Sequence, residues 1–266
     1  MSVTPHNQSR FPHYENPPVA EVVMGVSFAP FLGTWRAPHL GLFWDRIRDD
    51  FPRCEHVPPL GDAPPAAPGW PLPLPRTWFI SGDESVLIQL QNGRFLLNWR
   101  RREGQQYPRY SQIKPWFEAR LVQFRAFATQ EGLGDVSVRE CELTYINHVP
   151  HGGFVGSEGE LGKILRDVSW KGDEDRFLPS PKETALKWRF DLPHSRGILE
   201  LDVKHALRQP GNTPLYLVEL TARGSGQAIE GDVMQWFDLG HEWIVKGFAD
   251  LTTERAQVEL WRRIDE

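Results

Sequence analysis

His241 is the side chain best able to take part in chemistry, because it is a titratable ring at a position where an apolar residue is expected. The predicted helix around it carries an apolar stripe, and the same stripe occurs earlier in the chain with Leu121 at the equivalent position. A buried imidazole needs a hydrogen-bond partner or a cavity. His241 is therefore either a hydrogen-bonded core residue, or an acid or base in a pocket between helix and sheet. Asn147, in a predicted strand, is the second polar group that we expect at such a pocket.

Motifs that define a reaction or a cofactor are missing from the sequence. It contains no Walker-type phosphate loop, no Gly-x-Ser-x-Gly turn and no His-Glu-x-x-His helix. His241-Glu242 begins the last of these, but residue 245 is Val. Cys54 and Cys141 are far apart, so neither a disulfide framework nor a thiolate zinc site is indicated. We predict no cofactor and no metal site, and the sequence favours a non-catalytic protein without excluding an enzyme.

A second candidate surface is the outer face of the predicted sheet. If apolar residues such as Leu143 and Tyr145 face the helices, the alternating charged residues face outward. These residues are Glu140, Glu142, Lys187, Arg189, Glu200 and Asp202. Cross-strand ion pairs, each contributing about 0.2 to 1 kcal/mol, would make this a solvated face. The functional alternative is a recognition surface for a partner protein.

A short basic run, Arg100, Arg101 and Arg102, is the candidate for nucleic-acid binding. Tyr107, Arg109 and Tyr110 follow it as potential stacking groups. The formal net charge of the chain is −5, so it lacks the general positive field that drives phosphate-backbone binding. We therefore predict at most weak, salt-sensitive binding, and the simpler interpretation of the run is a solubilising hairpin edge.

The elements that must position these residues are predicted to occur twice. The order strand, helix, three strands, long helix is followed by the same order again, and Trp116-Phe117 at the start of one long helix matches Trp236-Phe237 in the other. The predicted fold class is α+β, a tandem duplication in which long helices cover one face of an antiparallel, curved sheet. As an analogy of fold alone, this arrangement is similar to the saddle of the TATA-binding protein and to helix-grip folds.

The predicted organisation divides the chain into four parts. Residues 1–17 are expected to form a flexible arm, 18–133 the first repeat, 134–256 the second repeat and 257–266 a C-terminal tail. A Pro-rich segment, 57–76, is expected to form a surface loop within the first repeat. In the second repeat, a helix is expected from Gly159 to Val168.

The composition is that of a folded globular protein. The chain of 266 residues is 40% hydrophobic and contains 11 Trp and 15 Phe, which is ample for a core. The sequence lacks an apolar run of the roughly 20 residues needed to span a bilayer, and residues 1–17 lack the pattern of a signal peptide. We expect a cytoplasmic protein that does not associate with membranes.

Several segments together resemble a sporadically distributed family of uncharacterised prokaryotic proteins. They are Asn16-Pro17-Pro18-Val19-Ala20-Glu21-Val22-Val23, Phe51-Pro52, Leu143-Thr144-Tyr145-Ile146-Asn147-His148-Val149, Leu199-Glu200-Leu201-Asp202-Val203, and His241 followed by Phe248 and Thr252-Thr253. The resemblance spans most of the chain, but the family favours a basic residue where this chain has Thr144. The resemblance implies a prokaryotic origin, and it implies no activity.

Three functions remain open at this point. The first is a non-catalytic binding or regulatory module with a protein partner, encoded by a neighbouring gene in a mobile system such as toxin–antitoxin or phage defence. The second is a small-molecule binder or enzyme that uses a helix–sheet pocket at His241 and Asn147. The third is weak nucleic-acid binding through Arg100 to Arg102. A buried pocket that meets His241 and at least one carboxylate would favour the second function.

Overall fold

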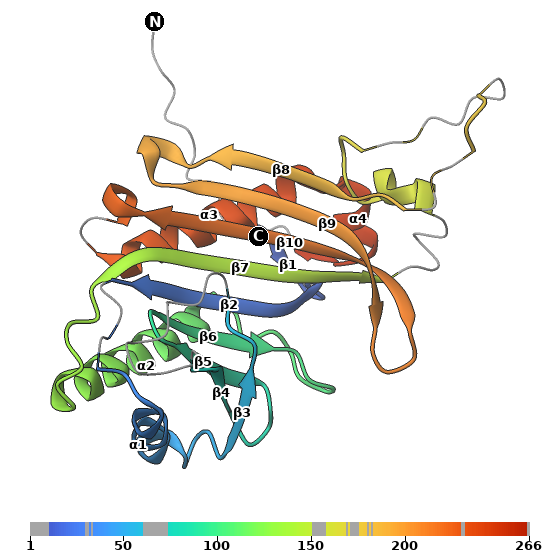
Figure 1. Cartoon of the computed structure of the whole chain (residues 1–266). Coiled ribbons are helices and arrows are strands. Elements are labelled where there is room, and N and C mark those ends of the chain that lie inside the picture. Colours follow the sequence, from blue (N-terminus) through green and yellow to red (C-terminus); the bar gives the residue numbers. More distant parts are fainter. Residues whose placement is uncertain are drawn as a thin grey trace, which may run out of the picture.

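A nine-stranded antiparallel sheet with long helices against one face dominates the computed structural model (Figure 1). The structure describes residues 11–29, 32, 34–60, 74–150, 158–168, 170, 176–179, 181, 183–229 and 232–264. The strand order is β3-β4-β5-β6-β2-β7-β10-β9-β8. The strands are β2 (Val19–Phe28), β3 (Arg53–Val57), β4 (Arg76–Ile80), β5 (Val86–Gln91), β6 (Arg94–Arg100), β7 (Val138–Pro150), β8 (Leu186–Asp191), β9 (Ile198–Arg208) and β10 (Thr213–Ser225). The sheet is open, with β3 and β8 at its edges.

Two long helices and two shorter ones accompany the sheet in the described residues. They are α1 (Ala37–Ile47), α2 (Tyr110–Gln130), α3 (Val233–Leu251) and α4 (Glu254–Glu259). Short 3₁₀ turns occur at Glu158–Lys163, Pro193–Ser195 and Gly226–Ile229. In the part of the chain that the structure describes, every helix is too short or too polar to cross a bilayer.

The sheet is built from two equivalent halves that meet at the antiparallel pair β2 and β7. From this pair outward, one half reads β2, β6, β5, β4, β3 and the other reads β7, β10, β9, β8. In each half the first strand in the sequence lies at the centre, and the strands that follow it run from the edge back toward it. The second half has the three predicted following strands, whereas the first half has a fourth, the edge strand β3. This order confirms the predicted duplication within the α+β class.

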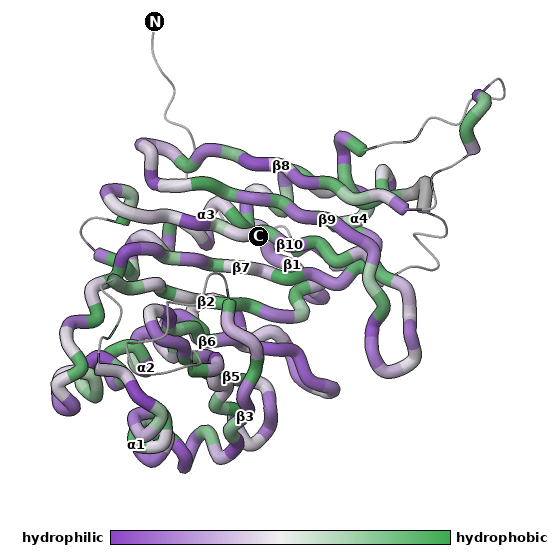
Figure 2. The backbone as a smooth tube through the Cα atoms, viewed as in Figure 1, coloured by the Kyte–Doolittle hydropathy of each residue, from purple (hydrophilic) through white to green (hydrophobic). Residues whose placement is uncertain are grey.

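The two halves share one hydrophobic core on the helix side of the sheet. The alternation of hydrophobic and hydrophilic residues along the strands can be followed in Figure 2, and in β7 Leu143 and Tyr145 are buried in the core. The long helices touch at Phe117 and Phe237, whose ring centroids lie 5.1 Å apart. This pair occupies equivalent positions in the two helices, which the shared apolar stripe predicts.

The neighbouring tryptophans are not equivalent, although the repeat predicts that they are. Trp116 is 39% exposed, whereas Trp236 is fully buried. The indole of Trp236 donates from Nε1 to the backbone carbonyl of Arg196 at 2.9 Å. Gly224 makes this position available, because a Cβ atom there would lie 2.3 Å from the indole nitrogen. The second half has thus acquired a buried aromatic that the first half lacks.

The chain ends differ from the predicted flexible arm and tail. Strand β1 (His13–Tyr14) pairs with β11 (Arg263–Ile264) in a separate two-stranded sheet. Tyr14 is buried with its ring edge-on to Phe248 and Trp261, and its hydroxyl donates to Gln257 at 3.2 Å. Burial of this aromatic fixes the residues before β2. Residues 1–10 lie outside the described residues, as do 61–73 of the predicted Pro-rich loop.

The predicted second-repeat helix from Gly159 to Val168 is wrong. The structure has only the six-residue 3₁₀ turn Glu158–Lys163, followed by an isolated bridge between Leu165 and Thr252. The segment contains Gly159 and Gly162, and each glycine costs about 1 kcal/mol relative to alanine in a helix. Burial of Leu165 against the end of α3 then fixes the shorter conformation.

Candidate functional site

A pocket of about 500 Å³ lies between the start of α2, the middle of α3, strand β7 and the segment 11–14. Its walls are mainly aromatic, with a few polar groups among them. The aromatic residues are Phe11, Tyr14, Tyr107, Tyr110, Tyr145 and Phe248, and the polar ones include Arg109, Asn147, Asp238 and His241. The two predicted ligand-binding candidates, His241 and Asn147, therefore lie on the wall of the same pocket.

Regular structure explains how these two residues meet. Tyr145 and Asn147 are two residues apart in β7, so both point to the helix side of the sheet. His241 lies on the apolar stripe of α3, which packs against β7 and β10. The equivalent residue in α2 is Leu121, which is 1% exposed in the core. The pocket opens where the second half has a polar ring in place of this leucine.

A chain of three hydrogen-bonding side chains crosses the pocket wall. The hydroxyls of Tyr107 and Tyr145 are 2.8 Å apart, and the Tyr145 hydroxyl lies 3.1 Å from Nδ1 of His241. Tyr110 stacks on the imidazole with ring centroids 3.9 Å apart and an angle of 9° between the planes. Because Tyr110 covers one face of the ring, His241 offers the pocket its edge. No described residue hydrogen-bonds to the second ring nitrogen, Nε2.

Burial keeps all three groups neutral at pH 7. It lowers the pKa of His241 to about 4, against the smaller opposing effects of Asp238 and Glu242. Burial also raises the pKa of Tyr107 to about 12 and that of Tyr145 well above its ordinary value. A neutral imidazole has one donor and one acceptor nitrogen. If the Tyr145 hydroxyl donates to Nδ1, then Nε2 carries the proton and can donate to a ligand in the pocket.

The charged side chains on the pocket wall differ in whether an oppositely charged side chain neutralises them. The carboxylate of Asp238 is held by Lys114, whose Nζ lies 2.7 Å from each oxygen, and it accepts a hydrogen bond from the Tyr110 hydroxyl at 3.0 Å. Arg109 instead donates from Nη2 to the backbone carbonyl of Tyr14 at 3.0 Å. Among the described residues, no carboxylate forms an ion pair with Arg109. The wall therefore carries an unneutralised positive charge.

Asn147 is 3% exposed and is tied to the sheet. Its side-chain Nδ2 donates to the backbone carbonyl of Val218 at 3.0 Å. This bond fixes the amide and uses one of its donors. The structure thus gives Asn147 a fixed orientation on the wall, with its carbonyl oxygen left as the acceptor.

The predicted partner surface is an ion-paired network on the outer face of the sheet. Glu200 is 8% exposed and accepts from Lys187 at 2.9 Å and Arg189 at 2.8 Å. Lys187 also lies 4.0 Å from Asp202. Arg223, which the sequence analysis did not single out, joins Glu142 at 2.8 Å to Glu200 at 3.6 Å.

Of the six predicted residues, five therefore take part in these cross-strand contacts. Glu140 shares the strand with Glu142 and makes no ion pair with a described residue. Such pairs are the arrangement expected of a self-neutralised face.

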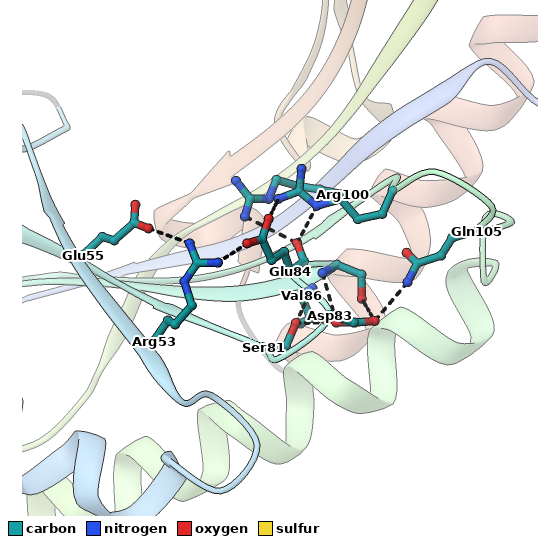
Figure 3. A network of polar contacts seen from close by, with 10 residues as sticks. Arg53, Glu55, Ser81, Asp83, Glu84, Val86, Arg100 and Gln105 are labelled. Atoms are coloured by element: carbon teal, nitrogen blue, oxygen red, sulfur yellow. Dashed lines mark hydrogen bonds and ion pairs between the residues drawn. The ribbon is translucent and has the colours of Figure 1, made fainter. Parts of the chain in front are cut away.

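The three arginines proposed for nucleic-acid binding all contact the protein itself. Arg100 and Arg102 donate to the backbone carbonyl of Glu84, at 3.4 and 3.0 Å. The Glu84 carboxylate forms ion pairs with Arg53 and Arg102, and Figure 3 shows this cluster. Arg101 donates to the backbone carbonyl of Pro17 at 2.8 Å. Tyr107, Arg109 and Tyr110 line the pocket instead of extending this basic run.

Residues whose roles depend on tertiary contacts could not be identified from the sequence. Phe11 and Tyr14 belong to the segment expected to be a flexible arm, yet both line the pocket. Tyr145 was expected only to face the helices. The run of aromatic and basic residues before α2 was the sequence signal that could have indicated the pocket. It was interpreted as part of a nucleic-acid site. In the described parts of the chain, no group of three or more His, Cys, Asp or Glu side chains could hold a metal ion.

Comparison with known proteins leaves the function of the site open. No protein-family model matches the chain, and no curated protein matches it significantly in sequence. One solved structure that the chain matches is DynU16, described as a putative protein in the dynemicin biosynthetic locus. The alignment covers 90% of this chain and 98% of DynU16, with 14% identity and a TM-score of 0.27.

Proposed function

We propose that this protein binds a small, largely apolar molecule in the pocket at His241. The observation that supports the proposal is the pocket itself, which has about 500 Å³ of space, aromatic walls and a small number of fixed polar groups. Ligand sites in proteins typically have volumes of about 300 to 1,000 Å³ and this composition. The pocket meets His241, Asn147 and the carboxylate of Asp238, which is the combination that favours the small-molecule hypothesis.

The experiment that tests the proposal fills the pocket without changing its charge. Val245 lines the pocket from α3, and the bulk of Val245→Trp would occupy the space. The matched control is Val122→Trp, at a position on α2 that is 58% exposed. Binding of the uncharged dye Nile red is measured by fluorescence titration for both variants and the wild type. Thermal melts first establish that each variant is folded.

The proposal predicts saturable dye binding that is lost in Val245→Trp and kept in Val122→Trp. Equal binding by the three proteins would place the dye elsewhere and would contradict the proposal. Absence of dye binding to the wild type would count against an apolar site.

A protein partner is our second proposal. It is supported by the adjacent side chains Phe177 and Leu178, which are 97% and 57% exposed. The partner would be cytoplasmic and encoded by a neighbouring gene, as in toxin–antitoxin or defence systems. Co-expression with the neighbouring gene product and pull-down test this proposal. The complex should form with the wild type and weaken when both residues are changed to serine, whereas no complex with the wild type would contradict it.

A further inference from the structure

The chemistry of the pocket wall narrows the class of ligand. The aromatic side chains favour a flat ring system, because aromatic rings stack or meet edge to face at centroid distances of about 4.5 to 7 Å. Tyr110 already stacks on His241, and Phe11 lies 5.5 Å from the same imidazole. A ligand ring therefore meets His241 at its edge, where Nε2 is available for a single hydrogen bond.

The charge on the wall selects the second ligand group. Lys114 neutralises Asp238, while Arg109 has no carboxylate partner among the described residues. The side chain of Arg109 is exposed and uses one N–H on the Tyr14 carbonyl. A guanidinium has five donors in a planar fork that matches a carboxylate. Arg109 therefore keeps the donors needed for an anionic group at the pocket wall.

We propose that the pocket is specific for planar aromatic carboxylates whose ring also bears a hydroxyl or carbonyl group. The carboxylate would bind Arg109, the ring would lie among the aromatic side chains, and the hydroxyl or carbonyl would hydrogen-bond to Nε2 of His241. This inference rests on the proposed function, since it names the ligand of the same pocket. His241 remains uncharged at pH 7, so Arg109 is the group that distinguishes an anion from a neutral ligand.

Three probes with the same ring system and nearly the same size separate charge from shape. They are 6-hydroxy-2-naphthoate, the neutral 6-(hydroxymethyl)-2-naphthol and the cationic 6-(aminomethyl)-2-naphthol. Their affinities are measured by isothermal titration calorimetry at pH 7. A charge-assisted pair to Arg109 should favour the carboxylate over the alcohol by about tenfold or more, and the amine should bind most weakly.

Variants of the full chain locate the effect. Arg109→Gln should bring the affinities for the carboxylate and the alcohol together. Arg48→Gln is the control, because Arg48 is exposed at the end of α1, does not line the pocket and pairs with Asp45. If Arg109→Gln lost all three probes through its contact with Tyr14, Arg109→Lys decides, since it keeps the positive charge. A retained preference for the carboxylate in that variant supports the inference, and equal affinities overturn it.

The outcomes also distinguish this inference from the proposed function. If wild-type protein binds the alcohol as tightly as the carboxylate, or if Arg109→Gln keeps the full preference, the ligand class is wrong. The same conclusion follows if the protein binds Nile red in the pocket but none of the naphthalenes. If neither the dye nor any naphthalene binds, both proposals fail.

Discussion

Acidification should destabilise the protein through His241. The folded protein holds the pKa of this imidazole at about 4, compared with the ordinary 6.5, mainly because the ring is buried. Between these two values the unfolded chain binds more protons than the folded one. Stability therefore rises with pH across this window and is lost as the pH falls from 6.5 toward 4. Since one pKa unit corresponds to about 1.4 kcal/mol, the full effect is roughly 3 kcal/mol.

The measurement compares wild type with His241→Gln, whose amide can accept from Tyr145 but does not titrate. Urea unfolding at pH 7.0, 5.5 and 4.0 gives the free energy of unfolding of each protein. The difference between the two proteins isolates His241 from the other titrating groups, including His148, whose pKa burial also lowers. The wild type should lose stability relative to the variant by roughly 3 kcal/mol on acidification. A difference that stays constant with pH would refute a buried, neutral His241.

Three further results follow from the same contacts. His241→Leu should change stability at pH 7 by no more than about 1 kcal/mol in chemical denaturation, because the Tyr145 hydroxyl keeps its bond to Tyr107. A loss above about 2 kcal/mol would mean that His241 anchors a larger buried polar network. Tyr145→Phe should cost about 1 to 3 kcal/mol in the same assay, because two buried partners lose their hydrogen bond, and no loss would contradict that network. Filter binding should show only weak, salt-sensitive affinity for DNA or RNA, since Arg100 and Arg102 contact Glu84. Sub-micromolar affinity at physiological salt that disappears when Arg100 to Arg102 are neutralised would show that the three arginines do form a nucleic-acid site.

The fold was predictable where local pattern and burial agree. Apolar residues alternate along β7 and form a stripe along α2, and each of these periods is compatible with only one type of secondary structure. The strand and the helix therefore follow from the sequence. The duplication was visible because both halves bury equivalent residues, such as Phe117 and Phe237. The end segments were not predictable in this way, because β1 is two residues long and is stabilised by contacts with residues almost the whole chain away.

The candidate site was predictable only in part. His241 stood out because a polar ring replaces leucine on an apolar stripe, and Asn147 was the second polar group expected at the same pocket. The roles of Tyr107, Tyr110 and Arg109 depend on how the start of α2 meets α3, which is a tertiary contact without a local signature. These three residues are near Arg100 to Arg102 in the chain, and the sequence alone therefore groups them with the basic run.

Observation of the His241 ring nitrogens by NMR during ligand addition tests the central claim most directly. Protein labelled with ¹⁵N in its histidines is titrated with 6-hydroxy-2-naphthoate, and the Nε2 resonance of His241 is assigned with the His241→Gln variant. His56, which contacts Thr77 on the edge strands, serves as the internal reference. The account predicts a saturable shift at Nε2 of His241 and none at His56. Binding that leaves the His241 nitrogens unchanged would contradict the claim that this pocket is the ligand site.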